Sequence, residues 1–152
     1  LYYLLRQPDG TPAQVDALYW NFGLHNTGSD TLPGQAGPVA EYAPYLRKIA
    51  AELSGWAART GTKLMFGVTT PMLNNAATDA VVMSNNRDAA SIAAEAGIPT
   101  LDMHAAVVGK CGAVPQDGCF GQKGCFSPHC VPAGYEWLAN STIAPAIRKL
   151  LE

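Results

Sequence analysis

The hexapeptide Leu64-Met65-Phe66-Gly67-Val68-Thr69 carries the clearest structural signal in the chain, because it is short, apolar and closed by Thr70 and Pro71. A run of this kind is typical of a strand buried on both faces of a sheet. It follows a segment from about Ala40 to Arg59 in which apolar residues recur every three or four positions, which predicts a helix ending near Gly61. A second helix is predicted after the strand, from about Asp79 to Ala96.

Two further apolar runs extend this alternation outward. Ala17 to Phe22 predicts a buried strand before the first helix, and Ile98 to Asp102 predicts a third strand after the second. A loop rich in cysteine and glycine is predicted from Gly109 to Pro128. Pro132 then opens a last helix, which Pro145 kinks or restarts. Strands that alternate with long helices predict an α/β fold with a parallel sheet.

Size and charge exclude several classes of protein. The chain has 152 residues, enough for one domain, so we interpret residues 1–152 as part of a single domain. A net charge of −2 offers no basic surface for nucleic acid or anionic lipid. No apolar run reaches the roughly 20 residues of a membrane span. The first residues, LYYLL, are already apolar, which favours a processed or truncated product.

The cysteines point to an oxidising compartment. All four, Cys111, Cys119, Cys125 and Cys130, fall in one short window, and Asn140 begins an Asn-Ser-Thr sequon for glycosylation. The combination favours an extracellular or secretory location. The spacings lack the paired C-x2-C steps of zinc modules, so two disulfides are expected, with no metal and no cofactor. Three pairings are open, of which we favour Cys111 with Cys119 and Cys125 with Cys130.

His129 is the strongest candidate for chemistry. It lies in a loop three residues ahead of Pro132, on a stiff base at the start of the last helix. A general base needs such fixed placement and a pKa near neutrality. The alternative is a histidine that caps the helix or faces solvent.

A second group of candidates follows the first and third predicted strands. Asn21, His25 and Asn26 could donate hydrogen bonds to a developing oxyanion, although Asn26 could equally cap the loop backbone. Asp102 and His104 could form a relay or bind a metal. We favour a structural role for Asp102, as a cap of the next segment.

Three stretches resemble the SGNH hydrolase superfamily, also called GDSL esterases. Tyr19-Trp20-Asn21-Phe22-Gly23-Leu24-His25-Asn26 is similar to the family's third block in its G-L-H-D variant. Asn86 to Asp102 resembles the helix and strand before the last catalytic loop. His129-Cys130-Val131-Pro132-Ala133-Gly134-Tyr135 is similar to the fifth block, H-x-x-P-x-G-Y. The resemblance spans nearly the whole chain.

The resemblance implies a flavodoxin-like sheet and hydrolysis of an ester by a serine nucleophile, with His129 as general base. Gly23 matches the glycine of the third block. His25 stands where the family has its oxyanion asparagine, and Asn26 where the block has aspartate. The aspartate expected three residues before the histidine is replaced by Phe126.

The family's serine and its oxyanion glycine normally precede the third block, so the resemblance implies that both lie upstream of Leu1. We therefore expect a C-terminal part of an esterase acting on an ester, such as a carbohydrate O-acyl group. It would be completed by an N-terminal segment or partner chain, or paired with a second copy. The alternative is a non-catalytic binding or structural protein of the same fold. A Gly-Asp-Ser-type segment about 50 to 100 residues upstream would favour the enzyme.

Overall fold

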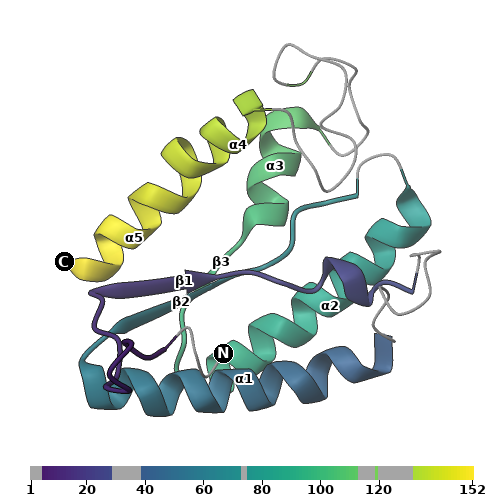
Figure 1. Cartoon of the computed structure of the whole chain (residues 1–152). Coiled ribbons are helices and arrows are strands. Elements are labelled where there is room, and N and C mark those ends of the chain that lie inside the picture. Colours follow the sequence, from purple (N-terminus) through teal and green to yellow (C-terminus); the bar gives the residue numbers. More distant parts are fainter. Residues whose placement is uncertain (1–4, 29–38, 73–74, 113–118, 120–131) are drawn as a thin grey trace.

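Three parallel strands form the sheet at the centre of the molecule (Figure 1). The computed structural model describes residues 5–28, 39–72, 75–112, 119 and 132–152. Strand β1 covers Ala17–Trp20, β2 covers Lys63–Gly67 and β3 covers Thr100–Leu101, in the order β1-β2-β3. Leu18 pairs with Leu64, and Phe66 with Thr100. The parallel α/β arrangement expected from the sequence is therefore confirmed.

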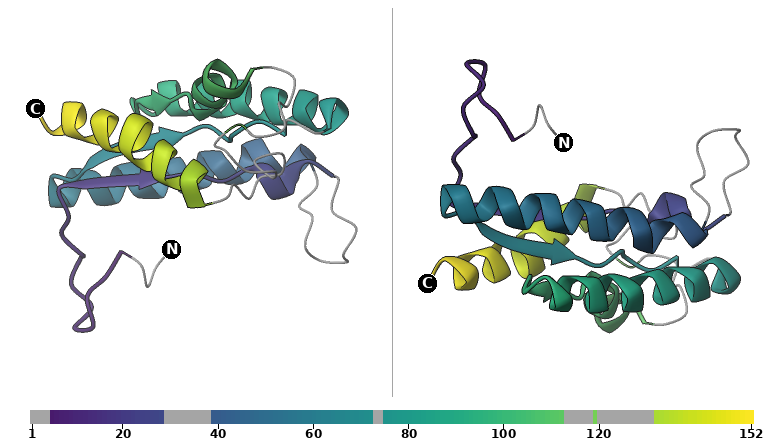
Figure 2. Two further views of the ribbon diagram at one scale, coloured as in Figure 1. Left: turned by 90° about the horizontal axis from the view of Figure 1, so that it is seen from above. Right: turned by 90° about the horizontal axis from the view of Figure 1, so that it is seen from below.

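Helices cover both faces of this sheet. Helix α1 spans Val39–Thr60 and α2 spans Ala76–Glu95, and these two pack together on one face (Figure 2). The other face carries α3 (Met103–Cys111), α4 (Pro132–Leu138) and α5 (Ala144–Leu151). A short 3-10 turn, η1 (Leu24–Asn26), follows β1. The result is a three-layer arrangement of helices, sheet and helices.

The main core lies between the sheet and α1 with α2. Phe66 on β2 is 1% exposed, and the rings of Trp20 and Phe22 meet it edge-on at centroid distances of 5.5 and 5.9 Å. From the helices, Leu53 and Ile92 are buried in the same cluster. Burial of apolar surface on this scale is the main favourable term in folding, and it fixes the strand ends from which the polar loops leave.

The predicted helix from Ala40 to Arg59 is confirmed nearly residue for residue, and the one from Asp79 to Ala96 begins three residues earlier than predicted. The three strands are present but shorter, with β1 ending at Trp20 rather than Phe22. The predicted loop from Gly109 to Pro128 is wrong at its start, because α3 continues to Cys111. Asp102 caps this nine-residue helix. The cysteine- and glycine-rich composition of its last residues led to the prediction of a loop there.

Pro145 restarts the last helix, as expected. A π-helical turn, η2 (Ala139–Ile143), separates α4 from α5, and Pro145 lies in the first turn of α5. Proline has no N–H to donate and its ring clashes with the preceding helical turn. The extra residue of the π-helical turn accommodates this break in the backbone hydrogen bonds of the helix. Asn140, the acceptor of the sequon, is exposed within this turn.

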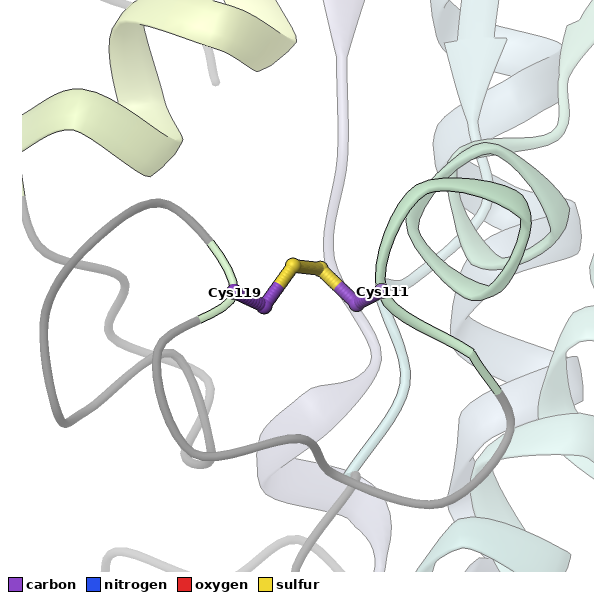
Figure 3. The surroundings of a disulfide bond; sticks show 2 residues. All are labelled: Cys111 and Cys119. Atoms are coloured by element: carbon purple, nitrogen blue, oxygen red, sulfur yellow. A yellow bond between two sulfur atoms is a disulfide. The ribbon is translucent and has the colours of Figure 1, made fainter.

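Cys111, the last residue of α3, forms a disulfide with Cys119 at a Cα–Cα distance of 5.4 Å (Figure 3). This is the first of the two pairings favoured by the sequence. Cys125 and Cys130 lie outside the described residues. The bond ties the chain after α3 to a small apolar cluster in which Val107 of α3 and Leu138 of α4 are buried. This cluster packs the two helices against each other.

Candidate functional site

The carboxyl ends of β1 and β2 are tied together by Asn21. Its side-chain Nδ2 donates to the carbonyl oxygen of Gly67 at 2.7 Å. Asn21 itself is exposed at this edge. The side-chain amide carries two N–H groups, and the bond to Gly67 fixes the plane of both. Asn21 is thus a donor group whose orientation the sheet sets.

The side chain of Tyr19, on β1, extends past the end of β2 to the first residue of α3. Its hydroxyl donates to Met103 Sδ at 2.8 Å, and its ring lies against Gly67, where an added Cβ would clash with the phenol. Burial raises the pKa of Tyr19 to about 12. The phenol therefore stays neutral and holds β1 against α3. A side chain at position 67 would force the Tyr19 ring to move.

Gly23 makes the sharp turn that follows β1. Its φ is +136°, which residues with a side chain rarely adopt, and a Cβ there would lie 2.8–2.9 Å from three atoms of Tyr42. Tyr42 donates its hydroxyl to the carbonyl oxygen of Phe22 at 3.2 Å. Burial, with a contribution from the Asp88 carboxylate, raises the pKa of Tyr42. A neutral, buried donor therefore clamps the backbone immediately before the turn.

The turn η1 is also held from α2. Asn26 N–H donates to the Gly23 carbonyl at 3.1 Å, and Asn85, which is 2% exposed, donates its Nδ2 to the Asn26 carbonyl at 3.2 Å. His25 is exposed on this turn, and Asn26 is half-buried. The structure therefore brings Asn21, Gly23, His25 and Asn26 together in one braced loop. The buried Asn85 was not singled out by the sequence.

A second asparagine of α2 fixes the chain after β2. Asn86 accepts from the Thr69 N–H through Oδ1 and donates to the Thr69 carbonyl through Nδ2, both at 2.8 Å. Asn86 and Thr69 are both buried. The adjacent asparagines on α2 thus hold the chain after β1 and the chain after β2 respectively. A pair of asparagines inside a helix is the sequence signal that could have revealed this, because asparagine is otherwise unfavourable there.

His104 pairs with Asp79, a contact that the sequence did not reveal. Nε2 of His104 lies 3.3 Å from each carboxylate oxygen of Asp79, and the two side chains are 16% and 22% exposed. Asp79 Oδ1 also accepts from the Met72 N–H at 2.7 Å. The carboxylate thus joins three segments beyond the sheet: the chain after β2, the first turn of α2 and the first turn of α3.

Asp102 has the structural role that was favoured. Its Oδ1 accepts from the Ala105 N–H at 2.8 Å and caps α3. The relay in which Asp102 and His104 act together is not formed, since His104 contacts Asp79. No group of three or more His, Cys, Asp or Glu side chains in the described residues could hold a metal ion.

His129 lies outside the described residues. The helix that follows it, α4, begins at Pro132 and starts on the side of the molecule toward which the strands point (Figures 1 and 2). The chain then returns through α5, which contacts β1 and β2, toward their amino ends. The start of α4 and the loop after β1 therefore both lie toward the carboxyl ends of the strands.

Comparison with known proteins gives no match to any protein-family model, curated protein or solved structure. A search of the helices in the described part of the chain finds none long and apolar enough to cross a membrane.

Proposed function

We propose that this chain is the C-terminal part of a secreted serine ester hydrolase of the SGNH type, with the flavodoxin-like sheet of that family. One observation carries the proposal: a braced polar loop, Asn21 to Asn26, stands at the carboxyl edge of a parallel sheet with helices on both faces. Open α/β sheets bind their ligands beyond this edge. The residues of this loop, Asn21 to Asn26, also carry the resemblance to the family's third block.

In this proposal the loop stabilises the oxyanion of the tetrahedral intermediate. Such a site needs donors whose direction is set before the reaction. The amide of Asn21 meets this need, because one N–H is committed to Gly67 and the other is held in a fixed direction at an exposed position. We therefore assign Asn21 the main donor role and His25, exposed on the turn, a role in contacting substrate.

His129 is the proposed general base. The helix that follows it begins on the carboxyl side of the sheet. A connection of three residues spans at most about 11 Å, which is short enough to stay on that side. An imidazole there would take the proton of the serine hydroxyl and return it to the leaving alcohol.

The serine is proposed to come from an upstream segment that also completes the sheet. Among the described strands β1 is at one edge, and its outer backbone groups face no other described strand. An apolar edge of this kind is usually paired or covered. The proposed substrate is an ester, such as a carbohydrate O-acyl group, in the secretory or extracellular space, where the Cys111–Cys119 disulfide persists.

Hydrolysis of p-nitrophenyl acetate tests the proposal. The 152-residue chain alone should show negligible turnover, and the polypeptide extended upstream should be active. In the extended protein, His129→Ala should abolish activity, and Asn21→Ala should lower kcat by about 10²- to 10³-fold. Gln14→Ala removes an exposed amide far from this edge and should change nothing.

Two results would contradict the proposal. An inactive extended protein would indicate a non-catalytic member of the fold. Turnover by the 152-residue chain that is lost in Ser29→Ala would place the nucleophile within this chain.

A further inference from the structure

A pocket of about 290 Å³ lies on the β3 side of the sheet, away from the loop after β1. It is formed by α2, β3 and the start of α3. Val68, Met83 and Ala90 supply its apolar wall. Arg87, Asp102 and His104 supply its charged and ionisable groups. An apolar wall with a few convergent polar groups is the usual composition of a small-molecule site.

Three polar side chains of this pocket, those of Asn86, Asp102 and His104, are held in place. Asn86 also lines it, and both of its polar atoms are bound to the Thr69 backbone. His104 is fixed by Asp79, and Asp102 by the N-terminus of α3. A site with fixed polar groups loses little entropy when a ligand binds.

Arg87 is the positive charge of the pocket. None of the described carboxylates forms an ion pair with it. Its guanidinium presents a planar fork of N–H donors that matches a carboxylate in two-point contact. The apolar wall beside it suits the hydrocarbon part of the same ligand.

Asp102 and His104 suit a hydrogen-bond donor of the ligand, in contrast to Arg87, which suits a carboxylate. An ionised carboxylate only accepts hydrogen bonds, so Nε2 of His104, which faces Asp79, carries the hydrogen. In the tautomer that carries its hydrogen on Nε2, Nδ1 is an acceptor. Asp102 uses Oδ1 to cap α3 and retains Oδ2 as an acceptor. Both groups therefore accept from a hydroxyl or ammonium group.

We propose that this pocket binds a small organic acid that carries a hydroxyl or ammonium group close to its carboxylate. Arg87 binds the carboxylate, His104 and Asp102 accept from the neighbouring donor, and Met83 and Ala90 contact the hydrocarbon part. The volume suits a small molecule rather than a polymer. This site is independent of the proposed ester hydrolysis.

Titration of the 152-residue chain followed by NMR tests the proposal, with phenyllactate and phenylalanine as probes. Phenylpropionate lacks the donor, phenylpropanediol lacks the carboxylate, and inorganic phosphate is an anion alone. We expect saturable shifts at Met83 and Ala90 with phenyllactate or phenylalanine, and binding at least about tenfold weaker with the other three.

Variants identify the contacts. Arg87→Gln should weaken binding of the preferred probe at least about tenfold. Arg59→Gln makes the same charge change at an exposed position on α1 and should leave binding unchanged. His104→Phe should reduce the preference for phenyllactate over phenylpropionate, because only the Asp102 acceptor remains, and a purely structural role would not change this preference.

Three outcomes would overturn the proposal: no saturable binding of either probe, equal binding by Arg87→Gln, or phosphate binding as tightly as phenyllactate. The last outcome would indicate a simple anion site. Thermal melts of each variant show whether a loss of binding reflects a loss of fold.

Discussion

Gly23→Ala should be among the most damaging single substitutions in the loop after β1. A backbone at φ +136° costs a residue with a Cβ about 1–3 kcal/mol. The new Cβ would also lie 2.8–2.9 Å from three atoms of Tyr42, whose ring is buried and cannot move away freely. Such overpacking costs a further ~1–3 kcal/mol. The expected loss is therefore about 2–6 kcal/mol, a large part of the 5–15 kcal/mol typical of a domain.

Urea unfolding of Gly23→Ala beside Gly97→Ala separates the two causes. Gly97 also has a positive φ, +68°, but no atom lies within 4 Å of its Cβ position. Gly97→Ala should therefore lose only the backbone term, about 1–2 kcal/mol. If Gly23→Ala loses no more than Gly97→Ala, the contact with Tyr42 does not hold the loop and the reasoning fails.

Three other substitutions test separate contacts. Asn86→Ala should lower the unfolding free energy by about 2–6 kcal/mol in urea, since it leaves two buried backbone groups of Thr69 without partners; a loss below 1 kcal/mol would refute the role given to this side chain. Above pH 10 the unfolded chain loses the Tyr19 proton while the folded one, with a pKa of about 12, keeps it, so stability should fall from pH 10 to 12; because the raised pKa of Tyr42 contributes to the same fall, Tyr19→Phe should make it less steep without removing it, and an unchanged slope would contradict the role of Tyr19. Cys111→Ser with Cys119→Ser should cost about 2–3 kcal/mol by loop entropy, and denaturing, non-reducing titration should find no free thiol in the parent chain; four free thiols there would contradict the Cys111–Cys119 disulfide.

The alternation of helices and strands was predictable because it depends on local periodicity. The helix over Ala40 to Arg59 carries its buried face in its own residues, and Leu64 to Thr69 is apolar enough to identify a buried strand. Helix α3 was harder to predict, because two valines and Gly109 lower its helix propensity, whereas the Asp102 cap, the burial of Val107 and the disulfide at Cys111 support it in the fold.

The candidate site was predictable in part. The sequence located Asn21, Gly23, His25 and Asn26 together, because polar residues directly after a buried strand lie at its carboxyl end. It could not identify Asn85, Asn86 or the Asp79–His104 contact, since these join segments distant in the chain and depend on the direction of each side chain. For Asp102 both a relay and a cap were considered, and the cap is confirmed.

The most direct test of the proposed function is covalent labelling of the upstream-extended protein with a fluorophosphonate, followed by peptide mapping. We predict that one serine upstream of Leu1 is modified, that His129→Ala abolishes its labelling, and that Gln14→Ala leaves it unchanged. Labelling that is equally rapid in His129→Ala, or no modified serine in a folded extended protein, would contradict a serine hydrolase that uses His129 as its base.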